Sequence, residues 1–158
     1  KAIEQGYTKE MLADTLKDQF GDIAENSSHY WQGLAEHTAL RIREFGRLQG
    51  YKKAKANYYK LVVILDDRTS DICRALAAQE RVYPLNDALE VMDNLMALDT
   101  KSNSLDEARD YIKAIAPWIK DDQIEYDTDM NPVGVSGTHT PFPPFHWKCR
   151  TTSMLISL

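Results

Sequence analysis

Two cysteines and a histidine carry the most specific chemistry in this sequence. Cys73 stands alone in mid-chain, whereas two residues separate His146 from Cys149 near the end. Thiolate and imidazole groups are the ligands that zinc prefers, and His-x-x-Cys is a workable chelating spacing. The pattern supplies no fourth ligand, and His139 is the only candidate nearby in sequence. Packed free thiols without a cofactor are the favoured interpretation, with zinc and a Cys73–Cys149 disulfide as alternatives.

The same segment holds the side chains of a metal-independent ribonuclease. His139 and His146 offer an imidazole base and acid, and Lys148 and Arg150 offer cations for a phosphate. This combination of residues is common, and the phosphate-binding glycine loops, nucleophile elbow and zinc-protease motif are absent from the sequence. We expect binding rather than turnover, with catalysis by His139, His146 and Arg150 as the alternative.

Charged residues near the centre and the end of the chain predict an ionic clasp. Arg68 and Arg150 can each form a two-pronged guanidinium–carboxylate pair with Asp66, Asp67 or Asp71. Such a pair would tie the turn after one strand to the turn before the last strand. A phosphate held by one of the arginines is the less favoured alternative.

One segment of the chain is basic although the formal net charge is −5. Glu44 is its single acid, and its basic residues are Arg41, Arg43, Arg47, Lys52, Lys53, Lys55 and Lys60. Tyr51, Tyr58 and Tyr59 interrupt it and could stack on bases. A solvated helix face is the simplest interpretation, and contact with DNA or an acidic partner is the alternative.

Helical periodicity predicts two helices in the first third of the chain. Thr8 can cap a helix that runs to Phe20, and Ser27 or Ser28 can cap the next one. The second helix carries one apolar stripe, formed by Trp31, Leu34, Ala35, Thr38, Ile42, Phe45 and Leu48.

Three short segments predict a small sheet. The apolar, β-branched run 61–65 is typical of a buried strand, residues 81–85 form a weaker candidate, and the apolar chain end supplies the third. A short helix capped by Thr69 should follow the first strand. The segment 127–134 resembles the start of a calcium loop, but Pro132 replaces the required glycine, so we expect an Asx turn.

A helical hairpin is predicted between the second and third strands. Asn86 or Asp87 can start its first helix, and Ser104 with Glu107 has the spacing of a capping box at the second. The apolar stripe of that second helix extends to Ile119, with a proline disturbing the last turn. The fold class is therefore α+β, in one domain.

The remaining composition is that of an ordinary globular chain. The longest apolar run is far shorter than the roughly 20 residues that cross a bilayer, so no membrane contact is expected. Two cysteines favour a reducing compartment. The first residue is Lys1 rather than Met, which suggests a piece of a longer product or a processed chain.

Three blocks of the sequence resemble the phage Mu F-like family of minor head proteins, the phage head-morphogenesis domain. AEHTALRIREFGRLQGY leads into the first strand, DDRTSDICRAL follows that strand, and PPFHWKCRTT precedes the last one. The family carries D-x-R-T-x-x-x-C and P-P-x-H-x-x-C-R elements. The matching residues here are Asp66 or Asp67, Arg68, Thr69, Cys73, Pro143, Pro144, His146, Cys149 and Arg150.

The resemblance covers roughly residue 30 to the end and implies a single head-morphogenesis domain over residues 1–158. Residues 1–28 would be an N-terminal helical extension and residues 86–120 a helical insertion. The implied role is head morphogenesis, with DNA packaging or ejection, through portal or capsid proteins and DNA. The implied location is the virion, assembled in the bacterial host cytoplasm.

Two other functions stay open beside this one. Such domains also occur in polymorphic toxin systems, where a ribonuclease-type toxin would be paired with an immunity protein. A zinc-stabilised interaction module is the second alternative. We interpret the two motif blocks as a fold signature rather than an active site.

Overall fold

The computed structural model describes residues 8–20, 28–101 and 104–156 of the chain, and their fold is α+β. The first half contains α1 (Lys9–Phe20), α2 (Ser28–Lys53), β1 (Tyr58–Val62), α3 (Asp71–Ala78) and β2 (Val82–Pro84). The second half contains α4 (Leu85–Met96), α5 (Leu98–Lys101), α6 (Leu105–Ile115), the 3-10 turn η1 (Asp121–Gln123), β3 (Ile124–Tyr126), β4 (Pro132–Val135) and β5 (Thr152–Ile156).

The three predicted segments form one antiparallel sheet in the order β2-β1-β5. The predicted bounds of its central strand, 61–65, are wrong. The strand is set by pairing on both sides, which places Tyr59 opposite Tyr83 and Leu155. Beyond Val62 the chain leaves the sheet, and Ile64 is 55% exposed. The apolar run therefore lies half in the strand and half in the following turn.

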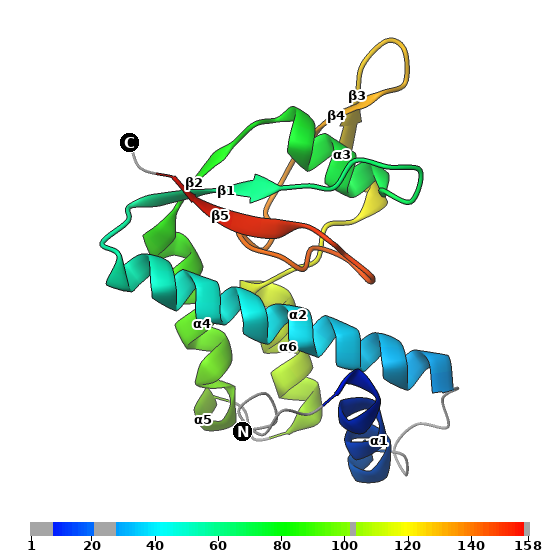
Figure 1. The fold of residues 1–158 in the computed structure, drawn as a ribbon, viewed down its shortest axis with the longest axis vertical. Helices are drawn as coiled ribbons and strands as arrows, with labels where there is room; N and C mark the ends of the chain where they lie inside the picture. Colours follow the sequence, from blue (N-terminus) through cyan, green and yellow to red (C-terminus); the bar gives the residue numbers. More distant parts are fainter. Residues whose placement is uncertain (1–7, 21–27, 102–103, 157–158) are drawn as a thin grey trace.

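The sheet lies between helices on its two faces (Figure 1). The long helix α2 runs below it in this view, and α3 lies above it with the small β3–β4 hairpin. One core includes Leu48 of α2, Tyr59 of β1 and residues of α4. A second core joins α3, β4 and the segment before β5, and it contains both cysteines. The cysteines therefore lie in this second core, away from α4.

Side-chain caps explain where several helices begin. Thr8 Oγ1 accepts a hydrogen bond from Met11 N (3.2 Å), and Ser104 Oγ accepts one from Glu107 N (3.2 Å), as predicted. The cap of α3 is Ser70, which accepts from the backbone N–H of Cys73, so the predicted Thr69 cap is wrong. α2 includes Ser28 as its first residue, and Ser27 lies outside the described residues.

The segment 86–120 is helical over most of its length. The hairpin of α4 and α6 is held by a hydrogen bond from Tyr111 Oη to Asn94 Oδ1 (3.4 Å). α4 begins at Leu85, directly after β2, rather than at Asn86 or Asp87. α6 ends at Ile115 rather than Ile119, because Pro117 lacks the N–H that the next turn requires.

The region after α6 forms a second, two-stranded sheet that the sequence did not predict. Its strands β3 and β4 pair antiparallel around the predicted turn. Asp127 Oδ1 accepts from the N–H groups of Asp129 (2.9 Å) and Asn131 (2.8 Å), so the Asx turn is confirmed. No helix within the described ranges is long and apolar enough to span a membrane.

Candidate functional site

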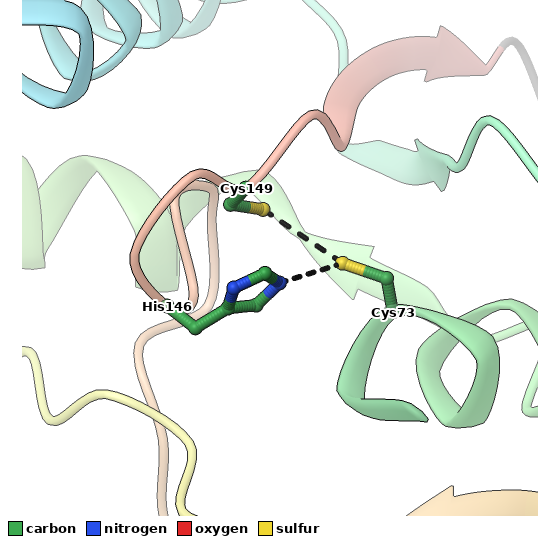
Figure 2. A group of neighbouring side chains, drawn as sticks. All are labelled: Cys73, His146 and Cys149. Atoms are coloured by element: carbon green, nitrogen blue, oxygen red, sulfur yellow. Dashed lines mark hydrogen bonds between the residues drawn. The ribbon is translucent and has the colours of Figure 1, made fainter. Parts of the chain in front are cut away.

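Cys73, His146 and Cys149 come together in the second core, although 73 and 76 residues separate Cys73 from the other two along the chain. The Sγ atom of Cys73 lies 3.1 Å from His146 Nε2 and 3.9 Å from Cys149 Sγ. Figure 2 shows all three side chains pointing toward one another, Cys73 from α3 and the other two from the loop before β5. The structure thus joins the two motif blocks at one place.

The loop that carries His146 and Cys149 is held firmly against the core. Phe145 is fully buried, and its carbonyl accepts from the N–H of Ile119 (3.1 Å). The N–H of Cys149 donates back to the carbonyl of His146 (3.3 Å), which closes a tight turn. The peptide bond between Pro143 and Pro144 is cis, and both prolines are buried. The hydrogen bonds and the buried side chains hold the backbone that carries His146 and Cys149 in place.

The orientation of the His146 ring is set by the backbone. Its Nδ1 atom lies 2.7 Å from the carbonyl oxygen of Trp147, an acceptor, so Nδ1 carries the proton. In the neutral ring, Nε2 is then the unprotonated atom, and it faces Cys73 Sγ and Ser70 Oγ, the latter at 2.9 Å. The lone pair of His146 is therefore aimed into the cluster.

The two thiols have different proton affinities. The pKa of Cys149 is lowered, because the neighbouring Cys73 thiol and, to a smaller extent, His146 stabilise its thiolate against the opposing effect of burial. The same contact with Cys149, together with burial, raises the pKa of Cys73. Burial disfavours the charged form of His146. The contact with Cys149 and the negative charge of its thiolate outweigh burial, so the pKa of His146 is raised. Cys149 is thus the first of the two thiols to lose its proton.

The sulfur atoms do not form the disulfide that the sequence left open. Both thiols are free, and their 3.9 Å separation is nearly twice the roughly 2.05 Å of an S–S bond. Thr151 Oγ1 donates a hydrogen bond to Cys73 Sγ (3.1 Å), and Thr151 is buried with it. The polar partners of the cluster are therefore hydroxyls from both motif blocks.

The predicted ionic clasp forms between Asp66 and Arg150. The two guanidinium nitrogens of Arg150 reach the two carboxylate oxygens of Asp66 at 2.8 Å and 2.5 Å. This pairing holds the pKa of Asp66 well below its ordinary value, because Arg150 stabilises the charged form. Arg74 also binds the backbone carbonyl of Asp66 through its guanidinium. The turn after β1 and the segment before β5 are thereby joined.

The other charged residues assigned to the clasp play smaller parts. Arg68 is 76% exposed and lies 3.7 Å from Asp66, within the same turn, so it ties no distant segments together. Asp67 is exposed, and Asp71 accepts a hydrogen bond from Tyr126 (3.3 Å) on β3. Thr69 Oγ1 donates to the carbonyl of Ile64 (2.7 Å) and stabilises the turn. The expectation of Arg68 in a second inter-turn pair is wrong.

His139 does not join the cluster, either as a fourth metal ligand or as a partner for His146. Its Nδ1 lies 2.7 Å from the carbonyl of Thr140, and its ring packs edge-on against Phe145. The described residues that could together hold a metal are Cys73, His146 and Cys149 alone. Two histidines close in sequence thus lie in different surroundings.

The basic stretch divides into residues with different roles. Arg47 binds the buried carboxylate of Glu44 (3.0 Å), and Arg41 is half-buried in α2. The exposed members are Arg43, Lys52, Lys53, Lys55 and Lys60. Arg43 and Lys148 also border a groove of about 690 Å³ beside the cluster. Only the exposed members are available to a partner.

Sequence reasoning missed Glu44, which is completely buried. Its Oε2 atom accepts hydrogen bonds from the backbone N–H (3.0 Å) and hydroxyl (2.6 Å) of Ser153, which ties α2 to β5. The available signal was its spacing of four residues from Leu48, which places both on one helix face. Ile42, assigned to the apolar stripe, is instead 43% exposed.

Trp147 is a second residue without an assigned role that proves central to the loop. Its ring stacks on Tyr30 (6.1 Å between centroids) and on His37 (5.9 Å), both on α2. Burial, followed by the charge of Arg41, lowers the pKa of His37 to about 4, so its ring is neutral near pH 7. This stacking braces the His146–Cys149 turn against α2.

Comparisons of the chain with family models, with curated proteins and with solved structures find no match.

Proposed function

We propose that this chain is a structural and binding domain of a phage minor head protein, which acts beside the portal during head morphogenesis and resides in the virion. The observation that carries the proposal is the meeting of the two motif blocks. Asp66 with Arg150, and Cys73 with His146 and Cys149, join them at one point. Residues that mainly contact one another are suited to holding a fold together, which supports a structural role rather than turnover of a substrate.

The ribonuclease alternative receives less support from the same geometry. An acid–base pair must reach one substrate from two sides, at hydrogen-bonding distance. His139 is turned toward its own backbone, and His146 is engaged by Ser70 and Cys73. Arg150, the cation for the phosphate, is paired with Asp66. Each of the three residues is thus occupied by another contact.

The proposed contact surface is the basic C-terminal end of α2. Lys52 and Lys53 lie in its last turn and are exposed, and Lys55 follows with a left-handed backbone (φ 58°). Exposed cations at the end of a rigid helix favour an acidic protein surface such as a portal ring, mainly through the association rate. Bound DNA is the competing outcome and has a steep salt dependence.

The test is co-sedimentation of the purified chain with portal rings and with procapsids, together with mass spectrometry of purified virions. We expect the chain in both, and we expect the Lys52→Gln/Lys53→Gln variant to bind portal rings roughly fivefold more weakly. Arg109→Gln/Lys113→Gln is the matched control, because it removes two exposed cations from α6. Absence of the chain from portals, procapsids and virions overturns the proposal.

The same purified chain also tests the nucleic-acid and toxin alternatives against the proposed role. Binding to DNA but not to portal rings would replace the proposed partner by nucleic acid. Cleavage of transfer or ribosomal RNA, abolished by His146→Asn, would replace the binding role by catalysis. We expect both RNAs to stay intact and expression of the chain to leave host growth unchanged.

A further inference from the structure

Three soft ligand atoms converge where α3 meets the loop before β5. The two sulfur atoms of Cys73 and Cys149 and one ring nitrogen of His146 all lie within 4.8 Å of one another. Two thiolates on a tetrahedral zinc ion are about 3.8 Å apart, given Zn–S bonds of about 2.3 Å. The observed separation of the two sulfur atoms is 3.9 Å. The sulfur pair already has the spacing of a zinc site.

We propose that Cys73, His146 and Cys149 bind one zinc ion, which ties the first turn of α3 to the loop before β5. The Cys73 Sγ–His146 Nε2 distance of 3.1 Å is shorter than a zinc site requires. It has to open by about 0.5 Å to match the S–N separation on a tetrahedral zinc ion. Cys73 and Cys149 are buried and come from different elements, so the ion would cross-link the second core.

The surroundings of His146 are an independent observation in favour of a metal. A ligating imidazole nearly always donates its other ring N–H to a carbonyl or carboxylate, which fixes its tautomer. The Nδ1 atom of His146 does this with the carbonyl of Trp147 (2.7 Å), while Nε2 points at the sulfur of Cys73. The stacking of Trp147 on His37 and Tyr30 holds that carbonyl in place. The loop therefore presents His146 in the orientation that a ligand requires.

A water molecule is the fourth ligand that the geometry allows. A cavity of about 10 Å³ adjoins the cluster and is lined in part by Ser70, His146, Arg150 and Thr151. This is room for about one water molecule, and the hydroxyls of Ser70 and Thr151 are suited to hold it. The site would then have three protein ligands and one solvent ligand, with His139 outside it.

Zinc binding exchanges protons of the cluster for the metal ion. One zinc ion binds Cys73 and Cys149 as thiolates and His146 through the Nε2 lone pair of its neutral ring, and any proton that these three ligand atoms held before binding passes to solvent. No atom changes its oxidation state. The inference rests on the cluster alone and stands whether or not the chain belongs to a phage head.

The experiment measures metal content and affinity in the full chain kept reduced. We expect one zinc per chain by elemental analysis, and a cobalt(II) titration that gives the intense sulfur-to-metal absorption of thiolate ligands. Cys149→Ser and His146→Asn should weaken zinc binding by more than about 100-fold, since loss of an outer-shell partner alone costs about 10–100-fold. Thr151→Val, which removes one such partner, should cost about tenfold.

His139→Asn is the matched control, because it removes a histidine from the same loop without touching the cluster. It should keep one zinc per chain and the affinity of the unaltered chain. Circular dichroism of each variant separates loss of metal from loss of fold. Protection of both thiols from alkylation by added zinc provides a second measurement that needs no variant. Zinc-free protein without a cobalt absorption band, or equal zinc affinity in His146→Asn and His139→Asn, overturns the proposal.

Discussion

Two buried polar clusters join distant segments of this chain, and they do so in different ways. At one, Glu44 of α2 binds the backbone N–H and hydroxyl of Ser153 on β5 and the guanidinium of Arg47. At the other, Cys73 of α3 meets His146 and Cys149. The first cluster pairs a charged acceptor with three donors, whereas the second gathers two thiols, which hydrogen-bond weakly, and one imidazole beside a small cavity.

The two clusters use buried polar groups in different ways. A buried carboxylate is stable only when its oxygens are hydrogen-bonded, and the donors around Glu44 meet that need within the protein. Thiols make weak hydrogen bonds, so the two sulfur atoms of the cluster around Cys73 gain little from their contacts within the protein. The first is therefore a completed structural contact, and the second is suited to accept something more.

The largest expected effect comes from breaking the completed contact. Glu44→Ala should lower the free energy of unfolding by about 3 kcal/mol, because it leaves the Ser153 groups and Arg47 without their acceptor in a buried place. Denaturant unfolding followed by circular dichroism measures the change. Glu44→Gln, which keeps one acceptor oxygen, should lose less.

Glu90 supplies the control for that prediction. It is exposed on α4, and Glu90→Ala should stay within about 0.5 kcal/mol of the unaltered chain. If Glu44→Ala were no more costly than Glu90→Ala, the Glu44 cluster would add nothing to stability and the comparison of the two clusters would fail.

A smaller effect is expected where α2 supports the second cluster. A Cβ atom on Gly33 would lie 2.4 Å from Cζ2 of Trp147, whose ring is stacked on His37 and cannot simply turn away. Overpacking costs about 1–3 kcal/mol, and the better helix propensity of alanine returns about 1 kcal/mol. Gly33→Ala should therefore lower the free energy of unfolding by about 1 kcal/mol.

Gly46 lies on the same helix and tests the sign of that prediction. Nothing lies within 4 Å of a Cβ atom placed there, so Gly46→Ala should raise the stability by about 0.5–1 kcal/mol. Thermal unfolding of the two variants measures the shifts in opposite directions. Stabilisation by both substitutions would mean that the Trp147 ring moves aside freely and does not brace the loop.

The sequence predicted the segments of the fold better than their contacts. Periodicity located the helices and the three sheet segments, because amphipathic spacing is a local property. It misplaced β1 because register depends on partner strands, here β2 and β5, which the apolar run 61–65 does not reveal. The apolar spacing placed the end of α6 at Ile119, which lies beyond the helix and is buried in the second core.

The candidate site was predictable in part for the same reason. His146 and Cys149 are three residues apart, so their proximity is visible in the sequence, whereas their meeting with Cys73 depends on the fold. The resemblance to paired motif blocks suggested it. Nothing comparable pointed to Ser153 as the partner of Glu44, because a serine in a strand carries no sign of what it faces. Long-range polar contacts are the part that local patterns miss.

The smallest expected effect concerns the clasp at the edge of the second cluster, and it appears as a dependence on pH. Arg150 lowers the pKa of Asp66, so the folded state binds a proton less readily than the unfolded chain at this carboxyl. Its contribution to stability is therefore present above the unfolded pKa of about 3.9 and is lost as the pH falls toward the lower folded pKa. Because both side chains are about a third exposed, solvent screens the pair and the contribution is small. The stability difference between the unaltered chain and Asp66→Asn should be largest above pH 5 and should shrink toward pH 2, as measured by denaturant unfolding at each pH.

Arg150→Lys keeps the charge but loses the second guanidinium contact, so its stability difference from the unaltered chain should follow the same pH trend with a smaller amplitude. A difference that is the same at pH 3 and pH 7 would assign the role of Asp66 to its hydrogen bonds within the turn, such as those from the Arg68 N–H and the Thr69 hydroxyl, rather than to its charge.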